Sequence, residues 1–511
     1  MHTGTDTQAP KSWSWSWSWL ASWHHRGRQP VDGASLALFR MLFGGLMLID
    51  MVRFFARGWV DSYYIKPGFN FSFVPGVVPW PGTGMYWHVG ATGVLAAMVG
   101  LGLWYRVAAP LLALALTYLF LLDKAEYLNH FYLICLLAWL FALIPAHRTW
   151  SLDRRLGLVQ GPAGVPQWVL WLLRFQIGLV YFYGGIAKLN VDWLSGTPVS
   201  DWVLDRSDLP VVGPLLAHPW AGLVVAWTGL LIDLTMPFLL LGRRTFWLGA
   251  GIALIFHVSN AMLFHIGVFP WLMLGTLVLF PRPDWPRILV GRGEQPVEQV
   301  APVQSGPRTL RTWLGAAALV TYVVLQLLVP LRHWCLPGDV TWTEEGHRFS
   351  WRMKLRDKNG KVKFYTTDPV TGERNKVRLK TWLSKRQRKK MAGHPDMIHQ
   401  FAQFVADQAE RQGKPRPKVT VKARASVNGG PRGLLIDPEV DLAAVQETWG
   451  AEPWILPRPA DNSAASKPEP AEPEDTEPGE TSDESTESSD EPDDPPDNPV
   501  VVPLAGAPTP S

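Results

Sequence analysis

Long apolar runs alternate with short polar connections over the first two thirds of the chain. A helix that crosses a membrane needs about 20 mostly apolar residues. Nine runs approach this length and are predicted as membrane-spanning helices: 35–54, 87–105, 107–123, 127–145, 168–188, 221–241, 245–263, 265–281 and 313–331. Gly, Pro and His interrupt the pair at 245–281, so the alternative for this pair is a broken or re-entrant element that lines a cavity.

Basic residues between the runs predict the orientation of the helices, because Lys and Arg favour cytoplasmic loops. With nine spans, the basic loops fall on one side, apart from a local exception at Arg53, Arg57 and Lys66. The polar stretches 123–130, 188–192 and 257–265 then share the opposite, non-cytoplasmic side with the segment after residue 331. A polar cluster at membrane level, covered by an extramembrane domain, is therefore expected.

The last third of the chain has a different pattern. Apolar and polar residues alternate over 347–379, and Asn359-Gly360 predicts a type I′ hairpin turn there. Residues 380–412 have helical periodicity, and 419–425 is predicted as a further strand. From residue 456, Pro, Ser, Asp and Glu dominate, which predicts a disordered acidic tail.

The predicted fold class is a mainly α polytopic membrane helical bundle of about nine spans, with an extramembrane α+β C-terminal domain and a disordered acidic tail. The expected boundaries are a low-complexity Trp-Ser extension at 1–31, a membrane helical domain at 32–331, a soluble α+β domain at 332–455 and the tail at 456–511.

Composition supports a membrane protein and excludes several functional classes. The chain has 27 Trp, a residue that concentrates at membrane interfaces, and its net charge of +4 comes with no nucleic-acid-binding motif. Its two cysteines, Cys135 and Cys335, do not make a disulfide framework. Metal motifs, Gly-rich phosphate loops and nucleophile elbows are absent from the sequence, so side-chain bases acting on an organic, membrane-soluble reactant are expected.

Lys188 is the first candidate for chemistry. It closes the run that ends in YFYGGIAKLNVDWLSG, one helical turn after Gly184 and Gly185. A lysine at the end of a span commonly extends its amine to the interface as an anchor. If the amine points into a dry cavity instead, desolvation favours its neutral form, which can act as a general base.

Polar residues in two other runs are further candidates. His130, beside Asn129, opens the fourth run, and this pair either caps the helix or holds a substrate. His257 and Asn260 lie three residues apart and share a helix face, with Phe264 as an aromatic wall; an interhelical hydrogen bond is the alternative. Arg174 and Asp233 lie well inside the fifth and sixth runs and are predicted to form an ion pair, because isolated charges at that depth are costly.

Four segments in the same order resemble the vitamin K-dependent γ-glutamyl carboxylases and their bacterial relatives, the HTTM-domain proteins. They are YFYGGIAKLNVDWLSG, LDKAEYLNHFYL, FHVSNAMLFHIGVFPWLML and TEEGHRFSWRMKL. The resemblance covers 32–406, most of the chain expected to fold.

The resemblance implies a reaction and a set of cofactors. Lys188 would deprotonate reduced vitamin K (phylloquinol or menaquinol), and attack by O2 would create a strong base that removes a γ-proton from a protein glutamate. The carbanion would take up CO2, and the quinol would leave as its epoxide. No metal is expected.

The resemblance also assigns residues to this reaction. His130 with Asn129 would be the second essential polar site, and His257, Asn260 and Phe264 would line the quinone–glutamate cavity. Trp351, with His347 and Arg356 nearby, would help present the glutamate.

The expected partners are membrane lipid and a Glu-containing exported protein, with no nucleic acid. The expected location is a bacterial plasma membrane, with the active site and the C-terminal domain on the non-cytoplasmic side. Two departures limit the match: the disulfide of the animal enzymes is not reproduced, and the C-terminal domain is shorter. Two rival functions therefore stay open, a quinol epoxidase without carboxylase activity and a non-catalytic membrane scaffold or transporter.

Overall fold

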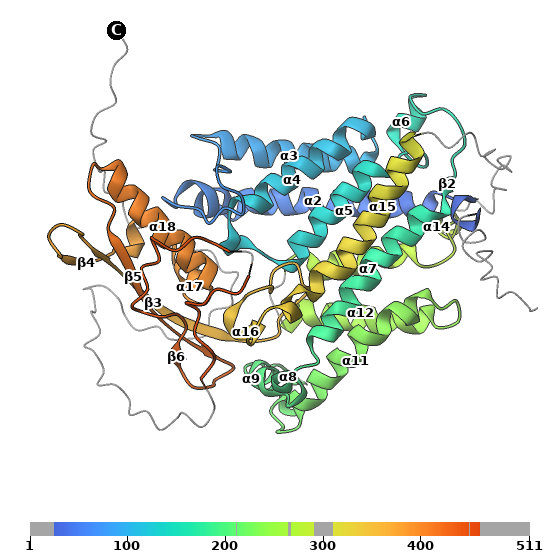
Figure 1. Ribbon diagram of the computed structural model, residues 1–511. Helices are drawn as coiled ribbons and strands as arrows, with labels where there is room; N and C mark the ends of the chain where they lie inside the picture. Colours follow the sequence, from blue (N-terminus) through green and yellow to red (C-terminus); the bar gives the residue numbers. More distant parts are fainter. Residues whose placement is uncertain (1–24, 211, 264–266, 291–309, 449, 460–511) are drawn as a thin grey trace, which may run out of the picture.

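The computed structural model describes residues 25–210, 212–263, 267–290, 310–448 and 450–459. A helical part and a sheet-containing part lie side by side (Figure 1). The helical part contains β1 (Pro30–Val31), α2 (Ala34–Ala56), η1 (Asp61–Ile65), α3 (Gly84–Leu101), α4 (Tyr105–Leu122), η2 (Lys124–Glu126), α5 (Asn129–Leu143), α6 (Leu152–Arg155), β2 (Val165–Pro166), α7 (Gln167–Ala187), α8 (Val191–Leu194), α9 (Thr197–Leu204), α10 (Gly213–Leu216), α11 (Ala221–Leu241), α12 (Phe246–Leu263), α13 (Phe269–Thr276), η3 (Leu277–Leu279), α14 (Pro286–Leu289), α15 (Leu310–Leu328) and η4 (Val329–Cys335).

Six helical segments among the described residues are long and apolar enough to cross a membrane. They are α2, α3, α4, α7, α11 and the continuous stretch Trp313–Cys335 formed by α15 and η4. All nine predicted runs contain helix, but α5, α12 and α13 with η3 are shorter, so nine spans are not confirmed. The backbone of Ile144 is extended, as expected before a proline, and this ends α5 after 15 residues.

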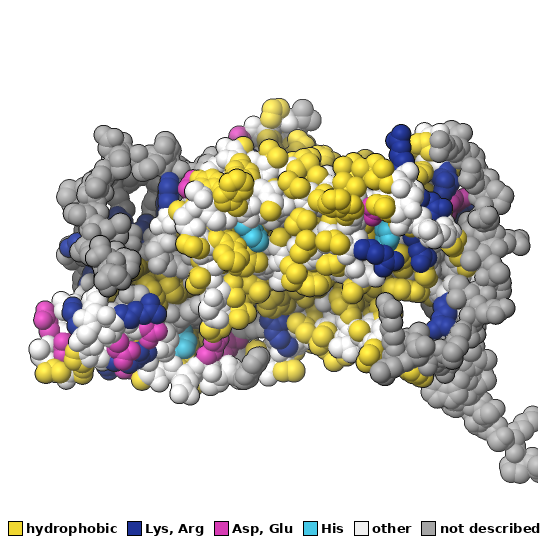
Figure 2. Space-filling model, turned by 90° about the horizontal axis from the view of Figure 1, so that it is seen from above, with side chains coloured by type: hydrophobic (Ala, Val, Ile, Leu, Met, Phe, Trp, Pro, Cys, Tyr) yellow, Lys and Arg dark blue, Asp and Glu magenta, His cyan; other side chains and the backbone are white. Residues whose placement is uncertain are grey.

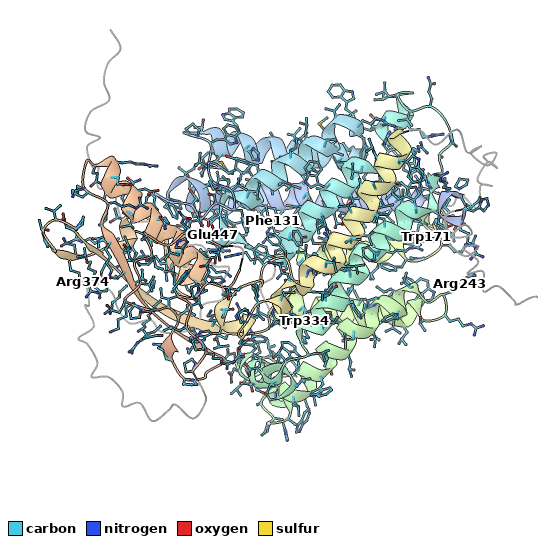
Figure 3. All side chains as sticks on the ribbon, viewed as in Figure 1. Phe131, Trp171, Arg243, Trp334, Arg374 and Glu447 are labelled. Atoms are coloured by element: carbon cyan, nitrogen blue, oxygen red, sulfur yellow. The ribbon has the colours of Figure 1, made fainter. Side chains whose placement is uncertain are left out.

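The outer surface of the helical part is apolar. Figure 2 shows a broad hydrophobic face over these helices, with Lys and Arg gathered at the end away from the sheet. Trp87, Val94 and Trp104 are each at least 60% exposed, although large apolar side chains favour burial in water-soluble proteins. Arg243, in the turn between α11 and α12, lies at the same far end (Figure 3). This surface suits contact with lipid, with basic loops at one end of the bundle.

The second part is built on a four-stranded antiparallel sheet in the order β4-β3-β5-β6. Its elements are α16 (Val340–Thr343), β3 (Lys358–Thr367), β4 (Arg374–Lys376), η5 (Leu379–Thr381), α17 (Lys385–Met391), α18 (Pro395–Arg411), β5 (Lys418–Val427) and β6 (Gly433–Leu434). One face of the sheet packs against α18, where Phe364 of β3 meets Phe401 edge-on at 5.1 Å. The prediction of strands and a helix in this region is confirmed, and the predicted strand 419–425 lies within β5.

The predicted hairpin at Asn359-Gly360 is wrong, because both residues lie inside β3, opposite Ser426 and Ala425 of β5. A Cβ atom on Gly360 would lie 2.4 Å from the carbonyl oxygen of Ala392, so a glycine lets the segment between α17 and α18 cross close over the strand. The chain turns later instead, through Gly372 at a φ of 69°. The predicted helix at 380–412 is also divided, because Pro395 begins α18 as a new helix.

Several predictions fall outside the described residues, including those for 1–24, Phe264 and the tail from 460. Cys135 is buried and Cys335 is exposed, and both are free thiols.

Candidate active site

One face of α7 carries the side chains that begin the site. Tyr181 and Gly184 lie seven and four residues before Lys188, so the three residues share one face of the helix. Lys188 is the residue at which the helix ends, and its backbone N–H still bonds to Gly185. A Cβ atom on Gly184 would lie 3.2 Å from Oδ2 of Asp233, so this glycine leaves room for a carboxylate from α11.

That carboxylate forms a buried ion pair with Lys188. Lys188 Nζ lies 2.5 Å from Asp233 Oδ2 and also donates to the carbonyl of Gly184 at 3.2 Å. Lys188 is 7% exposed and Asp233 is 5% exposed, and the Trp193 ring covers the amine at 5.1 Å. The amine therefore points into the protein rather than toward the interface as an anchor.

The predicted Arg174–Asp233 ion pair is wrong. The guanidinium of Arg174 donates instead to the carbonyls of Leu279, at 2.7 Å, and Pro281, at 3.2 Å. Both carbonyls lie at the end of the α13–η3 segment, where the last backbone oxygens of a helix have no hydrogen-bond donor within the helix itself. Asp233 is left to pair with Lys188, one turn beyond Gly184.

A second polar pair continues from the same face of α7. The Tyr181 hydroxyl and Nε2 of His257 are joined by a hydrogen bond of 2.6 Å, and Nδ1 of His257 is buried without a hydrogen-bond partner in the described part of the chain. The His257 ring meets Phe269 edge-on at 6.1 Å, and His130 stacks on Phe269 at 5.6 Å. The structure thus places His257 and His130 around one phenylalanine, with Lys188 two turns along α7 from Tyr181.

His130 also lines a cavity that the other candidates do not reach. This cavity measures about 90 Å³ and lies between α2, α4, α5 and the start of α13. Aromatic and aliphatic side chains form most of its wall, and polar groups come from Asp50, Arg53, Glu126 and Arg386. Lys188 and His257 are not part of its lining, and Asn260 is half-buried on α12. The cavity is therefore next to the Lys188 site rather than around it.

A loop from the second part, residues 344–356, enters the helical part beside these groups. Asn129 donates to the carbonyl of Arg352 at 3.1 Å and accepts from the Tyr127 hydroxyl, which in turn accepts from the backbone N–H of Phe349 at 2.6 Å. Trp351 is fully buried in the core of the helical part, 5.1 Å from the Tyr132 ring. Asn129 therefore holds the loop rather than facing an open cavity.

The 344–356 loop has an unusual backbone. Glu344, Phe349, Trp351 and Lys354 all adopt positive φ, between 46° and 65°, although none is glycine. Each such residue costs of order 1 kcal/mol or more and persists only where its surroundings fix it, which is common at functional sites. Met353 of the same loop lies beside Gly184, since a Cβ atom on that glycine would be 3.8 Å from the Met353 side chain. The loop therefore reaches the Lys188–Asp233 pair.

His347 and Arg356 lie at the base of this loop and face Glu344. The Glu344 carboxylate is held by Arg356, by Lys358 at 3.2 Å, and by the nearby rings of His347 and His394, at 3.9 Å and 3.8 Å. A second carboxylate, Asp396, binds Arg348 at 2.6 Å and Lys124 at 3.4 Å. Cations outnumber carboxylates in this cluster, and its members come from both parts of the molecule.

Burial sets the protonation of this cluster. It would raise the pKa of Glu344, but the charges of Arg356 and Lys358 hold that pKa well below its usual value. Burial lowers the pKa of His394 to about 3, against the attraction of Glu344, and lowers the pKa of His347 well below its usual value. Both imidazoles are thus neutral at physiological pH, beside an ionised glutamate.

These shifts predict a pH-dependent stability. Below pH 6.5 the unfolded chain takes up a proton on His394, whereas the folded chain does so only near pH 3, so folding loses stability as the pH falls. Glu344 contributes stability that is lost only below its unfolded pKa of 4.5. Replacing His394 with Gln should therefore reduce the loss of stability between pH 7 and pH 5 by about 2 kcal/mol.

Thermal unfolding of the purified protein, followed at both pH values, measures this difference. The exposed His218→Gln variant is the control and should keep the wild-type slope. An unchanged slope in His394→Gln would contradict the assignment of a neutral, buried imidazole.

The sequence patterns do not single out Tyr181 or Phe269, and they predict the wrong partner for Asp233. Tyr181 had a signal, since it lies seven residues before Lys188 on the same helix face. In the parts of the chain that the structure describes, no group of three or more His, Cys, Asp or Glu residues is arranged to hold a metal ion.

Two models of known protein families match the chain. A family model described as the HTTM domain matches residues 28–285. A second, described as the vitamin K-dependent gamma-carboxylase lumenal domain, matches residues 311–461. No solved structure matches the chain significantly. With both models matching in this order across most of its length, the chain belongs to the vitamin K-dependent gamma-carboxylase family.

Proposed function

We propose that this protein is a membrane enzyme that couples the epoxidation of reduced vitamin K by O2 to the carboxylation of glutamate in a protein substrate. The observation that carries the proposal is the Lys188 amine, buried against Asp233 on the same face of α7 as Tyr181, which is bonded to His257 two turns away. A buried amine of this kind is suited to proton transfer in a site from which water is excluded.

The residues around Lys188 fit a reduced naphthoquinone. When bound, the quinol supplies the oxygen chemistry that an amine lacks. His257 Nδ1 and Trp351 Nε1 are buried and have no hydrogen-bond partner among the described residues, so they are available to its oxygens, and Phe269 offers an aromatic face. The aromatic cavity beside His130 gives an apolar reactant a place next to the site. Phylloquinol and menaquinol share the ring that this environment would hold.

Lys188 and Asp233 would act as one proton-accepting unit. The pair holds one proton whether it is written as ammonium and carboxylate or as amine and carboxylic acid, and both forms are neutral overall. Accepting a proton from a quinol hydroxyl would give the pair a single positive charge. That charge would then face the anion left behind, which is favourable in a site of low polarity. Asp233 therefore positions Lys188 and balances its charge.

The 344–356 loop is the proposed place for the glutamate substrate. It brings Trp351 and Met353 to the Lys188 region, and its base is fixed by Arg356 and His347 through Glu344. In this proposal His347 and Arg356 set the position of the loop, and Asn129 anchors it. The substrate would be an exported protein or peptide that approaches from the side of the sheet-containing part, the non-cytoplasmic side of a bacterial plasma membrane. The basic loops at the opposite end of the bundle support this orientation.

An assay with two products tests the proposal. Purified protein in lipid nanodiscs is given reduced vitamin K, O2, labelled bicarbonate and a Glu-containing peptide. Formation of the quinone epoxide together with label fixed in the peptide is the expected result. Epoxide without fixed label would identify a quinol epoxidase that does not carboxylate. Neither product would favour a membrane scaffold or transporter and would overturn the proposal.

A further inference from the structure

Basic residues collect on one face of the sheet. Strands β3, β4 and β5 contain eight Lys and Arg residues and no acidic residue. The strand register puts residues that pair directly on the same face, and Phe364 with Val421 marks the face that packs on α18. Seven of the eight basic residues occupy the other face: Lys361, Lys363, Arg374, Lys376, Lys418, Lys422 and Arg424. We call these seven residues the cationic face.

Like charges stand directly opposite one another on the cationic face. Lys361 pairs with Arg424, and Lys363 pairs with Lys422. Side chains at such positions lie about 5 Å apart, and like charges there destabilise a sheet. Such a concentration of like charge on one face attracts an anionic partner.

The position of this face argues against lipid as that partner. Arg374 lies at the end of the molecule farthest from the helical part, and the sheet extends away from the helices (Figure 3). An anionic polypeptide suits such a face, and the chain itself contains one. Residues 460–511 hold fifteen Asp and Glu residues and one Lys, and all the acidic residues fall within 461–497.

The described chain ends where this segment can reach the face. Pro459 packs on Gly433 of β6, since a Cβ atom on Gly433 would lie 2.2 Å from its ring. Gly433 pairs with Ala425 of β5, so Pro459 lies on the α18 side of this edge strand, and the segment that follows would reach the cationic face by passing around β6. Neighbouring strands are about 4.8 Å apart, so the cationic face is roughly 10–15 Å wide. Ten extended residues span up to about 35 Å, so Glu469 and later acidic residues are within reach.

We propose that the acidic segment 461–497 docks on the cationic face of its own chain. Tethering gives such a segment a millimolar effective concentration, so several weak ion pairs suffice for substantial occupancy. The docked segment would cover the face and exclude other acidic polypeptides from it. This proposal does not depend on the catalytic function of the helical part.

Carbodiimide cross-linking of the full-length purified protein tests the docking, because this reagent joins Lys amines to adjacent carboxylates. We expect links from residues 461–497 to Lys361, Lys363 and Lys422 at low salt, and their loss near 1 M salt, where the screening length falls to about 3 Å. Mixing ¹⁵N-labelled with unlabelled protein separates links within one chain from links between chains. Links that spread equally to Lys66 and Lys389, or that form only between chains, would overturn the proposal.

A binding measurement provides an independent test. A fluorescent peptide of residues 461–497 is titrated into the chain truncated after residue 459. Replacing Lys361, Lys363 and Lys422 with Glu should weaken its binding about tenfold or more. The matched control replaces Lys389, Arg411 and Lys414 with Glu. These residues are exposed outside the cationic face, so this control should change the affinity for the peptide by less than about twofold.

If the triple Glu variant does not fold, as judged by its thermal unfolding, the same positions are changed to Gln. Equal binding to the face variant and the control would contradict the proposal. So would a tail peptide that fails to bind while anionic vesicles bind through the same lysines, since that result would make the face a lipid site.

Discussion

Replacing Lys188 with Arg is expected to lower epoxide formation by a factor of about 100 or more while leaving the protein folded. An arginine keeps a positive charge beside Asp233, so the buried ion pair can persist. A guanidinium does not give up its proton at physiological pH, however, so the form of the pair with a neutral nitrogen base, which would take the quinol proton, is lost. The loss of a general base lowers turnover by about 10²–10⁴-fold. Epoxide formation under saturating quinol measures the effect, and thermal unfolding checks the fold.

Two further variants make this result interpretable. Lys188→Ala should lose the same activity and should also lose stability, because it leaves Asp233 buried without a partner. Lys389→Ala, at an exposed position on α17, should change neither. Retention of full turnover by Lys188→Arg would mean that Lys188 is only a structural partner of Asp233.

Removing the carboxylate of Asp233 is expected to have the second large effect. Asp233→Leu leaves the Lys188 amine buried without its partner, which costs about 3–5 kcal/mol of stability. Adding Lys188→Met removes the unpaired amine and should recover most of this loss, because apolar replacements of a buried pair are commonly neutral or stabilising. The double variant should nevertheless stay inactive. Stability and activity thus separate, which a purely structural ion pair would not allow.

The Asp32–Arg287 pair is the matched control for this experiment. Its atoms lie 2.7 Å apart and Asp32 is buried, but the pair lies outside the candidate active site. Asp32→Asn should lower the unfolding temperature without lowering turnover per folded molecule. Equal losses of activity in the Asp32 and Asp233 variants would show that the assay reports folding alone.

The positions of the helices could be predicted from the sequence because burial in lipid or protein requires long apolar runs. The number of spans could not, because it depends on where each helix ends. Pro145 ends α5 after 15 residues. The α13–η3 segment ends at Leu279, whose carbonyl accepts a hydrogen bond from Arg174 of another helix. The Asn359-Gly360 error has a similar origin. Local turn preference favours a hairpin there, whereas contact with Ala392, distant in the sequence, requires the glycine within a strand.

The candidate site could be predicted in part. The sequence indicates Lys188, His257 and His130 as candidates because polar groups within or at the ends of apolar runs are unusual. Their partners depend on helix rotation and packing, which sequence spacing does not specify. Judged only by position along the apolar runs, Asp233 could pair with either Arg174 or Lys188. The close approach of α11 to Gly184 makes Lys188 its partner. No sequence pattern predicts that the 344–356 loop enters the helical part. Trp351 lies in a stretch of alternating apolar and polar residues, which predicts a strand, but it is buried in the core of the helical part.

Mass spectrometry of the peptide product tests the central proposal most directly. Wild-type protein is incubated with a Glu-containing peptide and bicarbonate, with and without reduced vitamin K and O2, beside Lys188→Arg. The account predicts glutamates that carry the added mass of one CO2 only in the wild type and only when both quinol and O2 are present. Unmodified glutamate from wild-type protein that is forming epoxide, or modified glutamate from Lys188→Arg, would contradict it.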